Sequence, residues 1–244
     1  MKVESSFANI NNTLAGKIGP SNSSKIAIDE GLKSQSNGHN VATNNIKTAD
    51  NAAKVAQAAL GTINDSLQSI RELALQASNG TLTGSDKTAI QSQIDQFKES
   101  IQDVVKNTNF NTKKLLDGSF EANIQTGPNS GQGQVMKIDD SSLETLGINN
   151  FDVTGEFDLK DIDSALEQVT SSRSKLGATS NRFEFAASVN NVSAENLESA
   201  RSTLKEDIAT QVSELNKNKI LDQFKLQMQQ QRAESKNSLL NLIG

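Results

Sequence analysis

The sequence contains no cysteine, no tryptophan and no tyrosine, and it has a single histidine. The absence of cysteine excludes disulfides, zinc–thiolate sites and thiol nucleophiles, although it does not by itself decide the compartment. A catalytic or metal-binding role for His39 would need partner residues that no motif supplies, so we expect this histidine to pack between helices. The sequence shows no nucleophile, metal or cofactor constellation, and we therefore expect no cofactor and no enzymatic activity.

The chain also lacks a dominant charge and a long hydrophobic run. Its 24 basic and 29 acidic residues give a net charge of −5, so no nucleic-acid partner is expected. No apolar run reaches the length that crosses a bilayer, and the first residues, MKVESSFANINN, have no apolar core of the secretory type. We expect no membrane insertion, and either an intracellular location or export by a route without a cleaved signal.

The remaining composition favours long helices over a thick core. Hydrophobic residues make up 34% of the chain and aromatic residues 4%, which is low for a compact globule. The chain is instead rich in alanine, serine, asparagine, glutamine, leucine and isoleucine. Such a mixture suits helices with narrow apolar faces.

Two helices are predicted in the first third of the chain. The first is short, and its apolar face consists of Val3, Phe7, Ile10 and Leu14. The Gly19–Pro20 pair and the serines after it are expected to end this helix. A long helix follows, with an apolar residue at every third or fourth position from Ile46 to Ala77 and the same phase extending back to Ile28.

A further helix and a small β-hairpin are predicted after the loop SNGTLTGS. Ser85 is a candidate N-cap with Asp86 in the first turn, and apolar residues from Ile90 to Val104 form the seam of this helix. It should pair with the preceding long helix as an antiparallel hairpin. Alternation over residues 120–124, a Gly/Pro/Asn turn and the β-prone QVMKI predict a β-hairpin. The stretch NNFDVTGEFDL is a loop or a final strand.

The longest helical pattern begins near Ile162 and keeps a heptad phase to Leu215. An unbroken helix of this span would be roughly 80 Å long, whereas a compact chain of this size has a radius of gyration of about 18 Å. We therefore predict a mainly α fold, a long antiparallel helical hairpin or coiled-coil rod with a small β-hairpin element. Four seam positions that set the register or meet a neighbouring subunit carry Arg173, Ser180, Asn190 and Arg201.

After Leu215 the predicted helix becomes apolar on several sides. Such a helix is normally buried on several sides, and nothing else in the chain is large enough to cover it. We expect the cover to come from other copies of the chain or from another partner. The apolar residues are Ile220, Leu221, Phe224, Leu226, Met228, Leu239, Leu240, Leu242 and Ile243.

Several motifs, in the same order along the chain, resemble bacterial flagellin. They are AIDEGLKSQSNGHN, SIRELALQASNGT, NTNFNTKKLLDG, the block over 176–215 that contains SNRFEF, and the tail ILDQFKLQMQQQRAESKNSLLNLIG. The resemblance implies a structural subunit of the flagellar filament that is exported unfolded, secreted and located in the extracellular flagellum. The partners it implies are other copies of the chain, the flagellar export apparatus with its chaperone, and hook-associated and cap proteins.

The resemblance also implies a domain scheme. Residues 1–24 and 205–244 would pair as a terminal coiled coil, residues 25–109 and 158–204 would form a helical rod, and residues 110–157 a small β-hairpin and loop region, with no outer variable domains. The assembly residues implied are Val3, Phe7, Ile10 and Leu14 in the N-terminal arm, and Leu221, Phe224, Met228, Leu239, Leu240 and Leu242 in the C-terminal arm.

The start of the chain departs from the family pattern. Flagellins usually begin with a longer N-terminal helix and an Arg-Leu-Ser-Ser-Gly-type turn, whose place is taken here by GKIGPSNSS. This departure keeps three alternatives open: a hook–filament junction subunit, a minor specialised flagellin, and a secreted receptor-binding protein.

The segment RELALQ resembles the part of flagellin that the vertebrate toll-like flagellin receptor reads. The matching residues and their neighbours are Arg71, Glu72, Leu73, Leu75 and Gln93. Two charges usual in the family are replaced by Ser69 and Gln93, so weak or absent receptor activation is expected. The alternative is that Arg71 and Glu72 face a neighbouring subunit. Some flagellins carry a zinc protease with a His-Glu-x-x-His motif, which a single histidine cannot form.

Overall fold

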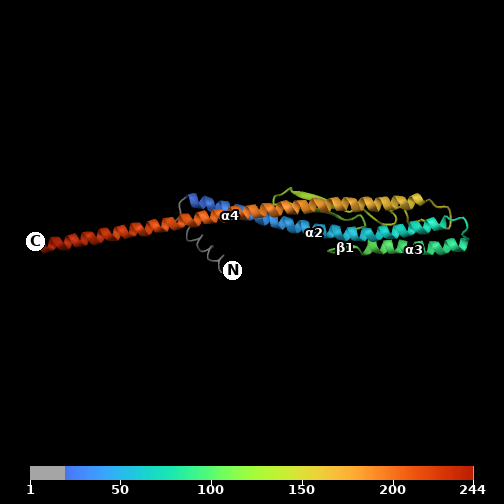
Figure 1. Ribbon diagram of the computed structural model, residues 1–244, viewed down its shortest axis with the longest axis horizontal. Coiled ribbons are helices and arrows are strands. Elements are labelled where there is room, and N and C mark those ends of the chain that lie inside the picture. Colours follow the sequence, from blue (N-terminus) through green and yellow to red (C-terminus); the bar gives the residue numbers. More distant parts are fainter. Residues whose placement is uncertain (1–19, 244) are drawn as a thin grey trace. The chain divides into compact units, whose positions relative to one another are not determined.

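The computed structural model describes residues 20–243, with side chains described for residues 24–235. The expected apolar face of Val3, Phe7, Ile10 and Leu14 lies outside the described residues. As predicted, the described elements are mainly helical (Figure 1). They include two small antiparallel β pairs, where the sequence predicts one. In chain order they are α2 (Pro20–Ala77), α3 (Gly84–Asn107), β1 (Asn109–Phe110), β2 (Lys113–Lys114), β3 (Glu121–Gln125), β4 (Gly133–Lys137) and α4 (Leu159–Ile243).

The contacts divide the chain into two units. The central unit is Asn37–Ser193, and the terminal unit combines the described residues up to Ser36 with those from Ala194 onward. Helices α2 and α4 each contribute to both units, whereas α3 and all the described strands belong to the central unit.

The central unit is built from three helices around a narrow apolar core. Helix α2 lies alongside both α3 and α4 (Figure 1). Helices α2 and α4 run antiparallel, because Arg71 near the end of α2 contacts Asp163 at the start of α4. Every predicted seam residue from Ile46 to Ala77 is buried, which confirms the helical pattern. Many of them are alanines, and these let the neighbouring helix backbones approach closely.

Within the central unit, helix α4 keeps the predicted seam with one correction. In the terminal unit the seam ends earlier than predicted, because Gln211 and Leu215 are exposed. Ile162, Val169 and Phe183 are buried as expected. Arg173, however, is exposed, and Ser172 takes the buried position. A helical period of 3.6 residues allows a step of three or four at this turn. The step of three turns the small Ser172 hydroxyl toward Asp139, at 3.3 Å, and leaves the long charged side chain in solvent.

Side-chain caps set where α3 and α4 begin. Thr83, not Ser85, is the N-cap of α3: its hydroxyl accepts from Asp86 N at 3.3 Å, and the Asp86 carboxylate accepts from Thr83 N at 2.9 Å. This pair of hydrogen bonds is a capping box, and it satisfies two backbone N–H donors. A cap at Ser85 could not form it, because the acidic partner must lie three residues after the cap and Asp86 is the next residue. At the start of α4, the Asp158 carboxylate accepts from Lys160 N at 2.9 Å, which satisfies one backbone donor of the first turn.

The predicted β-hairpin is confirmed. Strands β3 and β4 pair antiparallel from Glu121 opposite Lys137 to Gln125 opposite Gly133. Met136 on β4 is buried, which docks the hairpin on the helices. The stretch NNFDVTGEFDL is a loop up to Asp158 rather than a strand, and its last residue, Leu159, begins α4. Its buried Phe151 stacks edge-on against Phe157, with ring centroids 5.7 Å apart.

Two further details differ from the sequence prediction. Strands β1 and β2 form a second, very short hairpin whose turn residues Asn111 and Thr112 have positive φ of 47° and 68°. Helix α2 begins at Pro20, so the expected break over the serines that follow is wrong. Proline is tolerated in a first helical turn, where the backbone N–H has no helical acceptor.

Candidate assembly surfaces

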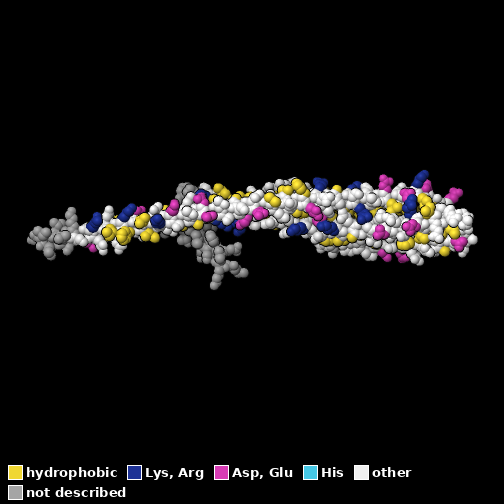
Figure 2. Space-filling model, in the orientation of Figure 1, with side chains coloured by type: hydrophobic (Ala, Val, Ile, Leu, Met, Phe, Trp, Pro, Cys, Tyr) yellow, Lys and Arg dark blue, Asp and Glu magenta, His cyan; other side chains and the backbone are white. Residues whose placement is uncertain are grey.

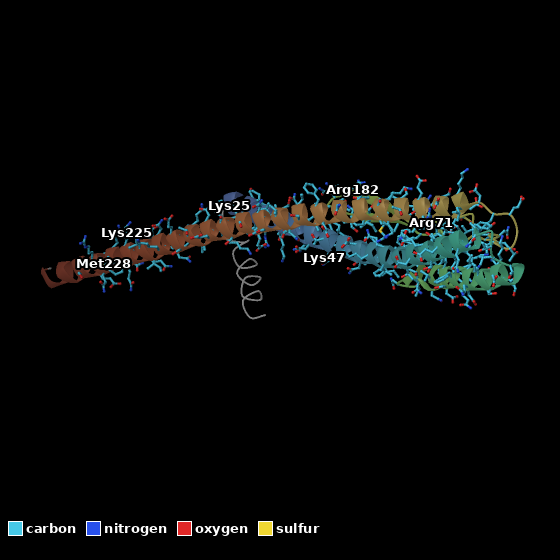
Figure 3. All side chains as sticks on the ribbon, turned by 45° about the vertical axis from the view of Figure 1, so that its right-hand side comes forward. Lys25, Lys47, Arg71, Arg182, Lys225 and Met228 are labelled. Carbon is cyan, nitrogen blue, oxygen red and sulfur yellow. The ribbon has the colours of Figure 1, made fainter. Side chains whose placement is uncertain are left out.

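The C-terminal arm, residues 205–243 of α4, carries large apolar side chains in solvent. Ile220 is 65% exposed and Phe224 61% exposed, and Leu221, Leu226 and Met228 are exposed as well. Figure 2 shows apolar side chains spaced along this arm, and Figure 3 labels Lys225 and Met228 on it. Within the part of the chain that the structure describes, nothing covers these side chains. The predicted assembly residues Leu239, Leu240 and Leu242 lie in α4, at positions where side chains are not described.

A group of ion pairs around the buried Arg201 lies in the terminal unit. The Arg201 guanidinium donates to Asp29 at 2.9 Å and to Glu198 at 2.6 Å, and Lys25 pairs with Asp207. Burial disfavours the Arg201 charge, but the hydrogen bonds to Asp29 and Glu198 outweigh it and raise its pKa. Arg201 is therefore a seam position that joins α2 to α4 within this unit. The predicted role in fixing the register rests on these contacts.

The segment resembling the receptor site is largely exposed. Arg71 donates to Asp163 at 2.6 Å, and this bond and the Asp163 charge raise the Arg71 pKa. Glu72, Leu75 and Gln93 are exposed, whereas Leu73 is half-buried against the core. Among the described contacts, none joins Arg71 to Gln93. The structure therefore places the Arg71 side chain between α2 and α4, where its guanidinium already has a carboxylate partner.

A second apolar surface lies on the central unit. Phe185, Val189 and Val192 are exposed on α4, with Phe185 73% exposed. Their spacing of four and three residues places them on one side of the helix, away from the seam that holds Phe183. We call these three residues the α4 outer stripe. It was not predicted from the sequence, because the prediction followed only the buried seam, and these residues repeat with the same helical period on the opposite side of the helix.

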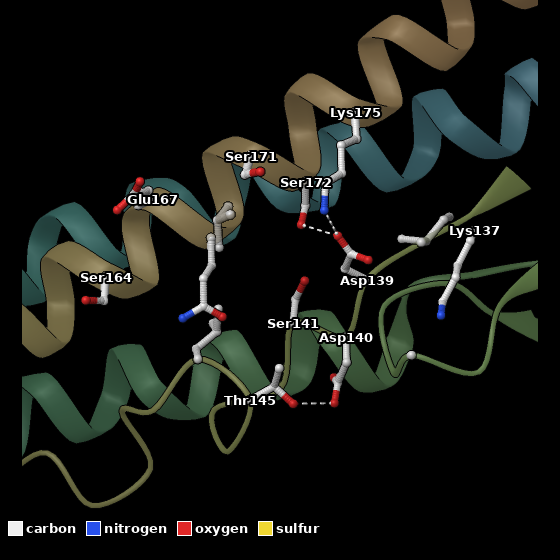
Figure 4. A pocket seen from close by; sticks show the side chains of 15 residues that line it. Lys137, Asp139, Asp140, Ser141, Thr145, Ser164, Glu167, Ser171, Ser172 and Lys175 are labelled. Carbon is white, nitrogen blue, oxygen red and sulfur yellow. Dashed lines mark hydrogen bonds and ion pairs between the residues drawn. The ribbon is translucent and has the colours of Figure 1, made fainter.

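A polar hollow of about 720 Å³ lies between α4 and the segment after β4 (Figure 4). Asp139 accepts from Lys175 at 2.9 Å, and that hydrogen bond holds the pKa of Asp139 below its ordinary value. Asp140 is engaged by the Thr145 hydroxyl at 2.5 Å. Asp139 and Asp140 thus already have partners, and the Asp139 contacts tie the segment after β4 to α4. The third carboxylate that lines the hollow is Glu167. In the described residues, no group of three or more histidine, cysteine or acidic side chains could hold a metal ion.

His39 packs between elements, as expected. Its Nδ1 lies 2.8 Å from Asn190 Oδ1, and Asn190 Nδ2 donates to the Thr126 carbonyl at 2.9 Å. Because a carbonyl only accepts, the amide orientation is fixed and His39 Nδ1 carries the proton. The three residues link α2, α4 and the end of β3. None of the helices described is long and apolar enough to cross a membrane.

These features define a class of protein: a helical subunit with exposed apolar side chains along its longest helix, which suits assembly with other chains. Comparison with known proteins then makes the family specific. The model for the bacterial flagellin N-terminal helical region matches residues 17–121, and the model for the bacterial flagellin C-terminal helical region matches residues 159–243. The chain belongs to the bacterial flagellin family and is a structural subunit of the flagellar filament.

Curated relatives that are flagellins match most of the chain. A flagellin from Bacillus subtilis is 33% identical and the match covers 89% of this chain and 85% of that protein. Flagellin FlaB1 from Treponema pallidum is 29% identical over 90% of this chain and 85% of that protein. Flagellins are structural proteins, and an extracellular filament is their location.

Solved structures support the fold. The crystal structure of Bacillus cereus flagellin has a TM-score of 0.53 at 24% identity and covers 60% of this chain and 88% of its own. A protein described as flagellar hook-associated, from Vibrio parahaemolyticus, has a TM-score of 0.62 at 14% identity and covers 76% of this chain and 98% of its own.

Proposed function

We propose that copies of the chain assemble into the filament by burying the C-terminal arm against one another. The observation that carries this proposal is the exposure of Phe224, Ile220 and their apolar neighbours on a helix that nothing covers in the described residues. Removing apolar area from water contributes about 25 cal/mol per Å², so several such side chains provide a substantial driving force. The α4 outer stripe is a second surface available to neighbouring copies.

The terminal residues and the central unit have different roles in this proposal. The C-terminal arm, with the N-terminal residues Val3, Phe7, Ile10 and Leu14, forms the terminal coiled coil, and the central unit supplies the body of the subunit. Family membership supports export through the flagellar apparatus with a chaperone, secretion, and contact with hook-associated and cap proteins at the filament ends.

Polymerisation of purified chain, followed by negative-stain electron microscopy, tests the proposal. Phe224→Ser should abolish or strongly slow filament growth, because it removes an apolar side chain from the arm without touching the core. Lys217→Ser, an exposed polar position on the same arm, is the matched control and should leave growth unchanged.

Protease protection of the arm is the second measurement. Residues 205–243 should be cleaved in the monomer and protected in the polymer. Equal protection in both states would contradict assembly through this arm. Short capped structures in place of long filaments would favour the hook–filament junction subunit.

We further propose that the chain activates the vertebrate toll-like flagellin receptor weakly. The support is the uncharged Ser69 and Gln93, where the family pattern has charges, together with the pairing of Arg71 to Asp163. Charge-assisted hydrogen bonds are roughly twice as strong as neutral ones, so restoring the charges should matter.

A cell-reporter dose–response tests this expectation. The double variant Ser69→Arg with Gln93→Glu should activate at lower dose than the unaltered chain. A strong response from the unaltered chain, equal to that of an activating flagellin, would overturn the proposal.

A further inference from the structure

We propose that Asn79 is a site of spontaneous deamidation in the folded protein, and that the same dipeptide at Asn37–Gly38 is protected by the fold. The sequence contains the pair Asn-Gly at residues 37–38 and again at residues 79–80. The two pairs share their local chemistry, so any difference in reactivity comes from the surrounding structure.

The reaction needs only water and hydroxide. Hydroxide removes the proton from the Gly80 backbone nitrogen, which attacks Cγ of Asn79 and forms a five-membered succinimide. The bond from Cγ to Nδ2 breaks, and the nitrogen leaves as ammonia after taking a proton from water. Water then opens the ring at Cγ, which gives aspartate, or at the backbone carbonyl carbon, which gives isoaspartate. No electrons are transferred, and NH2 is replaced by a hydroxyl that ionises to a carboxylate.

Two donors of Thr81 hold the oxygen of the Asn79 side-chain amide. Its Oδ1 accepts from Thr81 N at 3.1 Å and from the Thr81 hydroxyl at 3.0 Å. Because a backbone N–H only donates, the oxygen faces Thr81 and Nδ2 is the outer, departing group. The negative charge of the tetrahedral intermediate develops on Oδ1, where two donors already point.

The attacking nitrogen is also free. Asn79 and Gly80 lie in the exposed turn between α2 and α3, after the last helical residue, Ala77. Within the described residues, Gly80 N makes no hydrogen bond, whereas the neighbouring Asn79 N donates to Gln76 O at 3.1 Å. A side chain added at Gly80 would meet nothing within 4 Å, so the turn has room to rearrange around the ring.

Asn37–Gly38 has the opposite surroundings. Both residues lie well inside α2, where the Gly38 backbone N–H belongs to the helical ladder and is turned away from the side chain before it. Gly38 is also pinned against the hairpin loop, since a Cβ at this position would lie 2.8 Å from Pro128 Cβ. Attack on Asn37 Cγ therefore requires local unwinding of α2 and loss of the Pro128 contact.

Conversion of Asn79 changes the α2–α3 turn. Aspartate adds a negative charge just beyond the carboxyl end of α2, where a helix dipole disfavours it. Isoaspartate lengthens the backbone by one carbon within the turn that Leu82 N closes on Asn79 O at 3.1 Å. The modification thus acts on the connection that aligns the two helices.

The test follows both sites in the same full-length chain, incubated at mildly alkaline pH with and without urea. Proteolytic peptides are separated and their masses are measured by mass spectrometry. Isoaspartate is labelled with an isoaspartate methyltransferase as an analytical probe. In native buffer we expect acid forms at Asn79 and none at Asn37. In urea we expect both sites to convert at similar rates.

The variant Gly80→Ala separates chemistry from folding. Alanine fits the open space at residue 80, whose φ is not positive, and its methyl group crowds the attacking nitrogen. Circular dichroism should be unchanged and conversion at Asn79 should be strongly slowed. Equal conversion of both sites in native buffer would overturn the proposal. A conversion rate at Asn79 that is much lower in native buffer than in urea would overturn it as well.

Discussion

At the scale of single residues, the neighbours Phe183 and Phe185 show how position on one helix separates stability from assembly. Phe183 is fully buried in the apolar core, whereas Phe185, two residues later, is 73% exposed. Both occur in the motif SNRFEF, so the motif alone does not tell the two roles apart. The helical period does, because a step of two residues turns the side chain by about 200°.

Phe183→Ala should lower the free energy of unfolding by about 3 to 5 kcal/mol, since it removes a large side chain from a packed core. Phe185→Ala should leave stability within about 0.5 kcal/mol and instead slow polymerisation. Urea unfolding of the monomer measures the first effect and a polymerisation assay the second. A large stability loss from Phe185→Ala would show that the outer stripe is covered within the monomer.

At the scale of elements, helix α2 contains glycines with different surroundings. Gly61 has nothing within 4 Å of the place where a Cβ would stand. Gly38 would bring a Cβ to 2.8 Å from Pro128 Cβ and 3.2 Å from Pro128 Cα. Gly61 only weakens the helix, whereas Gly38 leaves room for the loop that connects β3 to β4.

Gly61→Ala should therefore stabilise the central unit by about 1 kcal/mol, the difference in helix propensity. Gly38→Ala gains the same propensity but must displace backbone atoms of Pro128, so we expect a net loss of stability. Urea midpoints at constant slope measure both changes. A stabilisation by Gly38→Ala equal to that at residue 61 would contradict the packing of the loop on α2.

At the scale of the whole molecule, acid should weaken the central unit. Four carboxylates have a pKa below the ordinary 3.8, and in each the main cause is a hydrogen bond from a side-chain or backbone donor. They belong to Asp86, Asp117, Asp139 and Asp152. A lowered folded pKa contributes stability that is complete above the unfolded pKa and is lost as pH falls through the folded value.

Unfolding in urea should thus show a free energy that falls as the pH drops below about 4. Asp139→Asn, which removes the partner of Lys175, should be less stable at neutral pH and should lose less on acidification. The difference between the two proteins should shrink toward low pH. A constant difference at every pH would show that the Asp139 charge contributes nothing.

The sequence by itself determined the class of fold, the α2 seam, the existence of the β3–β4 hairpin and the family. These properties are local or periodic: an apolar residue every third or fourth position dictates a buried helical face wherever a partner helix lies. The motifs that resemble flagellin are likewise strings of adjacent residues.

Only the tertiary structure decided the choices between near-equivalent positions. Ser172 rather than Arg173 faces inward, where its hydroxyl donates to Asp139, a residue distant in sequence. Gly38 matters because Pro128 packs on it, and the same contact distinguishes Asn37 from Asn79. Each choice depends on contacts between residues that are far apart in the chain. A pattern of residues adjacent in sequence does not determine such contacts.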